Sequence, residues 1–173
     1  QDDLKRNFYD RDNAASRWHF TPENIETLKT RIKEEGITHI LGSQIMLGNC
    51  ENKLRDKQIK FFEWAKAEGL EVIWADNFRP AVWHRTNQSA ARSTKVMKAV
   101  TQAFVSFEDE RTMHGDETPQ DTIDRLHGLG VREVVVTNGG KPITVSVKGE
   151  ETIKVDPAPP TSNEKHNAGA GDC

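Results

Sequence analysis

The sequence predicts an α/β fold with a mainly parallel, doubly wound sheet and an antiparallel hairpin near its C-terminus. Helix-like and strand-like segments alternate along most of the chain, as in strand–helix–strand units with right-handed crossovers. The segment Glu133–Thr137 contains an unbroken β-branched run, which is expected of a strand covered on both faces. Ile143–Val147 and Thr152–Val155 instead alternate apolar and polar residues around the short turn 148–150, which predicts the hairpin.

The other elements have local signals of their own. A helix is expected to begin at Thr21-Pro22, because threonine is a good N-cap and proline suits the first turn, and to end at Gly36. A second amphipathic helix is expected over about 54–67, before Gly69. The remaining expected elements are strands at 38–41, 70–75 and 103–105, a helix at 89–101, and a helix from Thr118-Pro119 to Gly128 or Gly130.

Composition limits the classes of function. A length of 173 residues suits about one domain, and a net charge of −3 argues against a nucleic-acid partner. No apolar run approaches the roughly 18 residues of a spanning helix, and the N-terminus lacks a signal-like region, so we expect a cytoplasmic protein without a membrane partner. Cys50 and Cys173 lie far apart and the histidines are scattered, so no metal-ligand spacing is present.

Unusual residues follow the strand expected at 70–75. Ligands of parallel α/β sheets bind at the carboxyl ends of the strands, and this strand is followed by Asp76-Asn77-Phe78-Arg79. Arg79 could bind a carboxylate or phosphate through two hydrogen bonds, with Asn77 binding a polar group beside it. The alternative is a surface turn in which Pro80 ends the strand.

Two further strand ends allow two interpretations each. Thr137-Asn138-Gly139-Gly140-Lys141 fits a tight hairpin, and it also fits a turn whose backbone is open to a nucleotide. The acidic segment Ser106–Glu110 fits a helix start favoured by the helix dipole, and it also fits a site for a hydrated magnesium ion.

The two ends of the chain carry further candidates. Gly169-Ala170-Gly171-Asp172 combines a small, glycine-rich loop, whose N–H groups can approach an anion, with a carboxylate that could take a proton from a substrate hydroxyl. Near the start, Tyr9-Asp10-Arg11 mixes aromatic and cationic residues, for which a solvated edge strand is the alternative.

Four of these segments, in this order, resemble the ribokinase-type (PfkB) carbohydrate kinases. Val72–Trp83 is similar to the family segment F-D-x-N-x-R-P-x-L-W, and Gly130–Val136 is similar to G-V-K-E-V-V-V. Gly169–Asp172 matches the G-A-G-D signature, and Phe8–Ala15 resembles the sugar-binding stretch Y-Y-x-R-x-x-A-A. The branch that it resembles most acts on 2-keto-3-deoxygluconate, so the resemblance implies a ribokinase-like fold and ATP-dependent phosphorylation of this sugar acid with Mg²⁺.

The resemblance also implies roles for individual residues. Tyr9, Arg11 and Arg79 would contact the sugar acid. Asp172 would be the general base, and Gly169–Gly171 would form the anion hole for the transferred phosphoryl group. On the nucleotide side, the implied contacts come from Asn77, Arg79, Thr137, Gly139, Gly169 and Gly171.

The sequence departs from the family pattern at several positions. Ser106 and Asp109 stand where the family has an N-x-x-E pair that organises magnesium, so no metal ligand is assigned. His166-Asn167-Ala168 replaces the usual D-T-T. We therefore expect residues 1–173 to be a partial ribokinase-like domain, the middle of a longer enzyme, with residues 1–20 belonging to the sugar-binding or lid region.

The sequence is also compatible with other functions. The alternatives are another kinase of the same family, such as a fructokinase or ribokinase, and a non-catalytic protein that binds a partner or nucleotide. Because an open sheet leaves apolar faces and edges uncovered, a homo-oligomer also remains an option.

Overall fold

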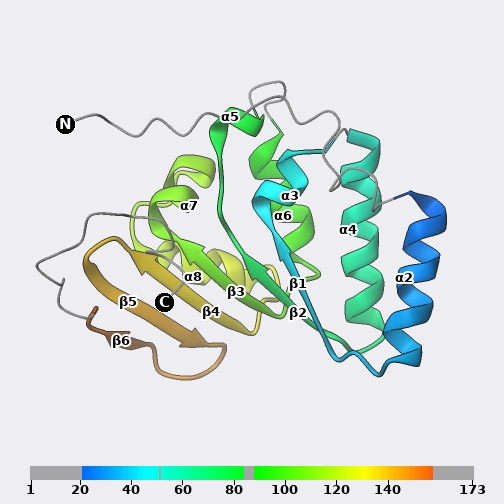
Figure 1. Cartoon of the computed structure of the whole chain (residues 1–173). Helices are drawn as coiled ribbons and strands as arrows, with labels where there is room; N and C mark the ends of the chain where they lie inside the picture. Colours follow the sequence, from blue (N-terminus) through cyan, green and yellow to red (C-terminus); the bar gives the residue numbers. More distant parts are fainter. Residues whose placement is uncertain (1–20, 51, 84–87, 158–173) are drawn as a thin grey trace, which may run out of the picture.

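Six strands form a single sheet in the computed structural model, which describes residues 21–50, 52–83 and 88–157 (Figure 1). The strands lie in sequence order across the sheet. They are β1 (His39–Ser43), β2 (Glu71–Ala75), β3 (Gln102–Ser106), β4 (Glu133–Asn138), β5 (Lys141–Val147) and β6 (Ile153–Val155). The helices are α2 (Pro22–Glu34), α3 (Gln44–Gly48), α4 (Asn52–Ala67), α5 (Pro80–Trp83), α6 (Ser89–Met97), α7 (Phe107–His114) and α8 (Pro119–Gly128).

The pairing of the strands confirms the predicted fold class. Strands β1 to β4 are parallel, whereas β4, β5 and β6 pair in antiparallel fashion. Val145 lies opposite Val135 on one side and Ile153 on the other, which fixes the register of the antiparallel part. The fold is therefore α/β with a mainly parallel sheet and the expected hairpin at residues 141–155.

The described helices pack on one face of the sheet. Helix α4 contacts β2, α8 contacts β4, and α7 contacts both β3 and β4, and Figure 1 shows α4, α6, α7 and α8 gathered on one side. Right-handed crossovers between strands in sequence order place successive helices on the same side. On the opposite face the side chains of Leu41 and Phe104 are 66% and 48% exposed. The second helix layer of a doubly wound sheet is not formed by the described residues.

Local sequence signals explain the helix starts. Thr21 caps α2, accepting a hydrogen bond from Asn24 N at 3.3 Å, with Pro22 at the first position. Thr118 caps α8, and Asp121 completes a capping box. The short helices α3 and α5 were not predicted, because four or five residues are too few to show a helical period.

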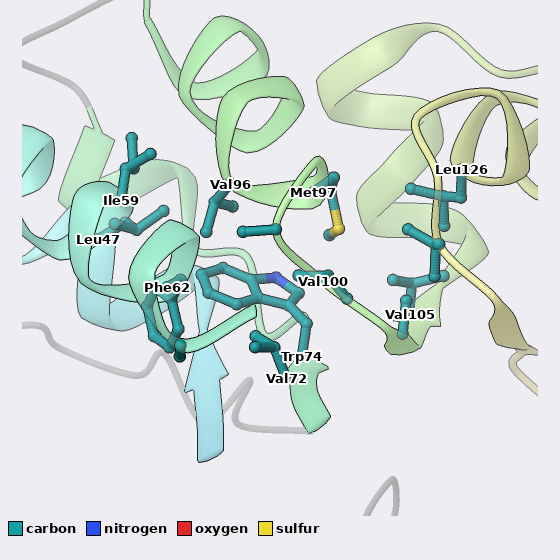
Figure 2. Packing of buried hydrophobic residues seen from close by; sticks show 14 of the residues in the cluster. Leu47, Ile59, Phe62, Val72, Trp74, Val96, Met97, Val100, Val105 and Leu126 are labelled. Carbon is teal, nitrogen blue, oxygen red and sulfur yellow. The ribbon is translucent and has the colours of Figure 1, made fainter. Parts of the chain in front are cut away.

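Trp74 lies at the centre of the core between the sheet and the helices. Its side chain is fully buried, and its ring meets Phe62 of α4 edge-on, with centroids 5.7 Å apart (Figure 2). Val96 and Val100 approach the same ring from α6 and the turn that follows it. This layer holds the ends of the strands in fixed positions. Within the described ranges, no helix is long and apolar enough to cross a membrane.

Gly42 of β1 leaves room for that aromatic pair. A Cβ atom at this position would lie 2.6 Å from the Phe62 ring and 2.7 Å from the Trp74 ring. We expect Gly42→Ala to lower the free energy of unfolding by about 1–3 kcal/mol, because two packed rings must move. Urea denaturation measures the change.

Gly128 provides the control, since a Cβ atom there meets nothing within 4 Å and the residue is helical. Gly128→Ala should be neutral or stabilising by up to about 1 kcal/mol. An unchanged stability in Gly42→Ala would contradict the packing described for β1.

Candidate functional site

The turn after β2 is fixed by the neighbouring strands. Asp76 N donates to Phe104 O at 2.9 Å, and Gln44 N donates to Asp76 O at 2.9 Å. Asn77, the next residue, is exposed and has a φ of 59°. Asparagine is one of the few residues that tolerate this left-handed conformation. The turn thus presents the Asn77 side chain at the carboxyl edge of the sheet.

The same turn is bound to helix α7. Phe78 N donates to Asp109 Oδ2 at 3.2 Å, and Arg79 Nη1 donates to Phe78 O at 2.8 Å. Burial raises the pKa of Asp109, while the nearby Arg79 guanidinium and the Phe78 amide oppose that rise. Asn77, Arg79 and Asp109 are therefore brought together, as their positions at successive strand ends predict.

Residues 106–110 form the beginning of a helix. Ser106 stands at the N-cap of α7, without a side-chain capping bond, and the first turn carries Glu108, Asp109 and Glu110. Carboxylates are favoured there by the helix dipole, so the helix interpretation of this segment is confirmed. Among the described residues, no group of three or more His, Cys, Asp or Glu side chains is arranged to hold a metal ion.

The segment after β4 is a tight hairpin. Asn138 pairs with Lys141 across the β4–β5 turn, and Gly139 has a φ of 56°. This confirms the hairpin interpretation of the sequence. A Cβ atom on Gly139 would meet nothing within 4 Å, so the turn is open on its outer side. Thr137 lies beside Ser106 in the register of β3 and β4, and its hydroxyl donates to Val105 O at 3.3 Å.

A buried group of charged residues lies directly behind the turn, and sequence reasoning did not find it. Arg125 of α8 is its centre: Nη2 donates to Asp116 Oδ2 at 2.7 Å and also to Glu110, whose side chain is fully buried. Thr122 donates to the same Asp116 oxygen at 2.7 Å. The sequence does show an acidic residue, Asp76, directly after a buried strand, which could have pointed to buried charge here. No spacing in the sequence indicates that Glu110 lies in the same region.

Burial and partners act differently on the three carboxyl groups. The pKa of Asp76 is raised well above its ordinary value, first by burial and then by the charges of Glu110 and Asp109. Burial also raises the pKa of Glu110, although Arg125 opposes this. For Asp116, burial acts upward, but hydrogen bonds from Arg125 and Thr122 outweigh it and lower the pKa. Among these acids, Asp76 is the one that most favours its neutral form.

His114 is neutral at physiological pH. Burial, followed by the charge of Arg125, lowers its pKa to about 4. Its Nε2 atom lies 3.8 Å from Glu110 Oε2, but a neutral imidazole makes no ion pair with this carboxylate. His114 therefore fills space beside the charged group without adding to its charge.

This neutral histidine should make the protein less stable in mild acid. The unfolded chain takes up a proton near pH 6.5, and the folded chain does so only near pH 4. Stability from this group is thus present above pH 6.5 and is lost as the pH falls towards 4, by up to about 1.4 kcal/mol per pH unit. His114→Gln should flatten this part of the stability profile.

The measurement is urea denaturation at several pH values between 6.5 and 4. Thr112→Ala, an exposed change on the same helix, should keep the wild-type slope. Equal slopes in His114→Gln and the wild type would contradict the buried, neutral state of His114.

Six of the predicted site residues lie outside the described residues, so the structure does not place them. They are Tyr9, Arg11, Gly169, Ala170, Gly171 and Asp172. The remaining four, Asn77, Arg79, Thr137 and Gly139, lie at or just beyond the carboxyl ends of β2 and β4, which flank β3. The described part of the candidate site is therefore a single edge of the sheet.

The chain is similar to curated proteins named 2-dehydro-3-deoxygluconokinase. The protein of Escherichia coli (strain K12) is 28% identical over 158 residues, which cover 91% of this chain and 50% of that protein. The protein of Dickeya dadantii (strain 3937) is 26% identical over 148 residues, covering 86% and 47%. The chain thus spans about half the length of the curated relatives it matches.

Solved structures share its fold. A putative ribokinase II from E. coli in its apo form has a TM-score of 0.70 at 20% identity, covering 90% of this chain and 47% of that one. A fructokinase from Halothermothrix orenii has a TM-score of 0.57 at 26% identity, covering 68% and 41%.

A family model described as "pfkB family carbohydrate kinase" matches residues 2–173, almost the entire sequence. The ribokinase-like fold and the order of the motifs agree with this match. The chain belongs to the pfkB family of carbohydrate kinases.

Proposed function

We propose that this chain is part of an enzyme that transfers the γ-phosphoryl group of ATP to a sugar acid, 2-keto-3-deoxygluconate. The observation that carries the proposal is its similarity, over most of its length, to relatives named 2-dehydro-3-deoxygluconokinase. In this proposal residues 1–173 are a partial ribokinase-like domain, and residues 1–20 belong to the sugar-binding or lid region.

The described geometry supports a site for anions at the turn after β2. Arg79 is a fixed positive charge, and its Nη1 bond to Phe78 O leaves other N–H groups of the guanidinium for a ligand. Asn77 presents an amide beside it. In the proposal, Arg79 binds the carboxylate of the sugar acid and faces the phosphate side, where Asn77 contacts the nucleotide. Tyr9 and Arg11 complete the sugar-acid contacts.

The nucleotide would lie along the turn between β4 and β5. The outer side of Gly139 is open, so a base or phosphate can approach the backbone without a steric clash. Thr137 stands one residue inside the same strand end. A solved relative, a putative ribokinase II from E. coli, is in complex with ATP and Mg²⁺ and matches 79% of this chain at 22% identity, with a TM-score of 0.64. We extend both ligands to this chain as part of the proposal.

The proposed chemistry is in-line phosphoryl transfer. Asp172 takes the proton of a primary sugar hydroxyl, and the oxygen of that hydroxyl bonds to the γ-phosphorus. The bond from the γ-phosphorus to the leaving ADP oxygen breaks in the same step. The N–H groups of Gly169, Ala170 and Gly171 would stabilise the charge on the transferred group. The Mg²⁺ ion would neutralise phosphate charge, and Asp109, whose carboxylate is influenced by the charge of Arg79, could face it through water.

A neutral sugar is the second candidate substrate. The likeness to a fructokinase at 26% identity favours it, because that relative phosphorylates fructose by name. The two candidate substrates differ in charge: only the sugar acid has a carboxylate, which Arg79 and Arg11 could bind.

A panel of sugars tests the proposal. The protein is completed to the length of its relatives, and kcat/KM is measured with ATP and Mg²⁺ for 2-keto-3-deoxygluconate, fructose and ribose. We expect the sugar acid to be preferred by about tenfold or more, because a charged hydrogen bond contributes about 1.5–3 kcal/mol. A preference for fructose or ribose would replace the proposed substrate while keeping the kinase. Nucleotide binding without turnover would favour a non-catalytic role.

A further inference from the structure

Helix α3 lies beside the segment that carries Asn77 and Arg79. This segment, residues 76–83, consists of the turn after β2 and helix α5, and α3 contacts α5 as well as α4 (Figure 1). Gln44, the first residue of α3, donates from its backbone N to Asp76 O at 2.9 Å. The beginning of the segment is therefore bound to the beginning of α3.

The end of the same segment is bound to the end of α3 through Arg55 of α4. Arg55 Nε donates to Leu47 O at 2.8 Å, and Nη2 donates to Gly48 O at 3.0 Å. Its guanidinium lies over the Trp83 ring of α5, with Cζ 4.6 Å from the ring centroid. Arg55 and Trp83 are both buried, with exposed fractions of 6% and 3%. One guanidinium thus joins three helices.

Arginine is suited to this contact because its guanidinium is planar. A planar cation can donate hydrogen bonds from its edge while its face stacks on an aromatic ring. The last carbonyl groups of a helix have no partner inside that helix, and those of Leu47 and Gly48 accept from Arg55. A lysine at this position would keep the charge, but it would lose the flat stack and the paired geometry of the two bonds.

We propose that Arg55 is a positioning residue for Arg79. Pro80, the first residue of α5, directly follows Arg79, so the orientation of α5 sets the direction in which Arg79 leaves the turn. Four residues make only one helical turn, which is not stable by itself, and Trp83 anchors this turn in the core beside Arg55. The binding of a sugar-acid carboxylate by Arg79 rests on the proposed function. The contact between Arg55 and Trp83 does not.

A double-mutant cycle tests the positioning role in the protein completed to the length of its relatives. Arg55→Lys should raise KM for 2-keto-3-deoxygluconate by about tenfold, because a displaced Arg79 loses part of a charged hydrogen bond to the carboxylate. The value of kcat should change little. In an Arg79→Met background, Arg55→Lys should have no further effect on KM, because the residue through which it acts is already absent.

Arg31→Lys is the matched control for this cycle. Arg31 belongs to α2, pairs with Glu35 at 2.7 Å and has a side chain that is 66% exposed. The same chemical change at this exposed position should leave KM at the wild-type value. An equal rise of KM from Arg55→Lys with and without Arg79 would overturn the positioning role.

NMR spectra of the wild-type protein test the contact itself, without a substitution and without catalysis. We expect a nuclear Overhauser signal between the side-chain protons of Arg55 and the ring of Trp83. The Nε–H group of Arg55 should exchange with water more slowly than that of Arg31, because it is buried and bonded to Leu47 O. A missing signal, or equal exchange rates, would show that the contact is not formed.

The backbone amides of Asn77 and Arg79 report on positioning independently of activity. Their signals should shift in Arg55→Lys and keep their wild-type positions in Arg31→Lys. Unshifted amides in Arg55→Lys would refute the positioning role whether or not the protein is a kinase. Shifted amides without phosphorylation of the sugar acid refute the proposed function and keep the role of Arg55, whereas phosphorylation with unshifted amides does the reverse.

Discussion

Asp172→Asn is expected to lower kcat by about 10²–10⁴-fold in the protein completed to the length of its relatives. Asparagine keeps the shape of aspartate but cannot accept the proton of the attacking hydroxyl. Since this transfer occurs only in the transition state, KM for ATP and for the sugar acid should change little. Initial rates at varied substrate concentrations separate kcat from KM.

Asp124→Asn is the matched control, because Asp124 is exposed on α8 and bonds only to Gln120 among the described residues. It should keep the wild-type kcat. If Asp172→Asn also kept it, Asp172 would not be the base, and the role proposed for Gly169–Asp172 would be wrong.

Arg125→Leu should lower the free energy of unfolding by about 3–5 kcal/mol, the usual result of removing one partner of a buried ion pair. The change leaves Glu110 and Asp116 without their cation in a buried position. Urea denaturation at neutral pH measures this loss. Part of it should return at low pH, where the two abandoned carboxylates become protonated.

Arg132→Leu tests whether burial is the cause. Arg132 also pairs with two carboxylates, Glu71 at 3.1 Å and Glu133 at 3.0 Å, but its side chain is 50% exposed. Exposed pairs contribute only about 0–1 kcal/mol, so its loss should be small. Equal losses in Arg125→Leu and Arg132→Leu would contradict the buried network behind the site.

The sheet was predictable from the sequence because its signals are local. The β-branched run at Val134–Val136, the capping residue Thr118 and the alternation at Ile143–Val147 each specify an element without reference to distant residues. The same rules placed Asn77 and Arg79 at a strand end, where the structure has them.

Pairing between distant side chains was not predictable in this way. Glu110 and Arg125 are joined only because α7 and α8 meet in the fold, and no spacing in the sequence indicates it. Local sequence signals also could not predict which face of the sheet is covered by helices. Phe104 is β-compatible in sequence, but its 48% exposure depends on which segments lie above it.

The measurement that tests the account most directly is the mass of the product formed from 2-keto-3-deoxygluconate with ATP and Mg²⁺. With the protein completed to the length of its relatives, the account predicts a product heavier by one phosphoryl group, formed together with an equal amount of ADP. Release of inorganic phosphate with an unchanged sugar acid, or no consumption of ATP, would contradict it.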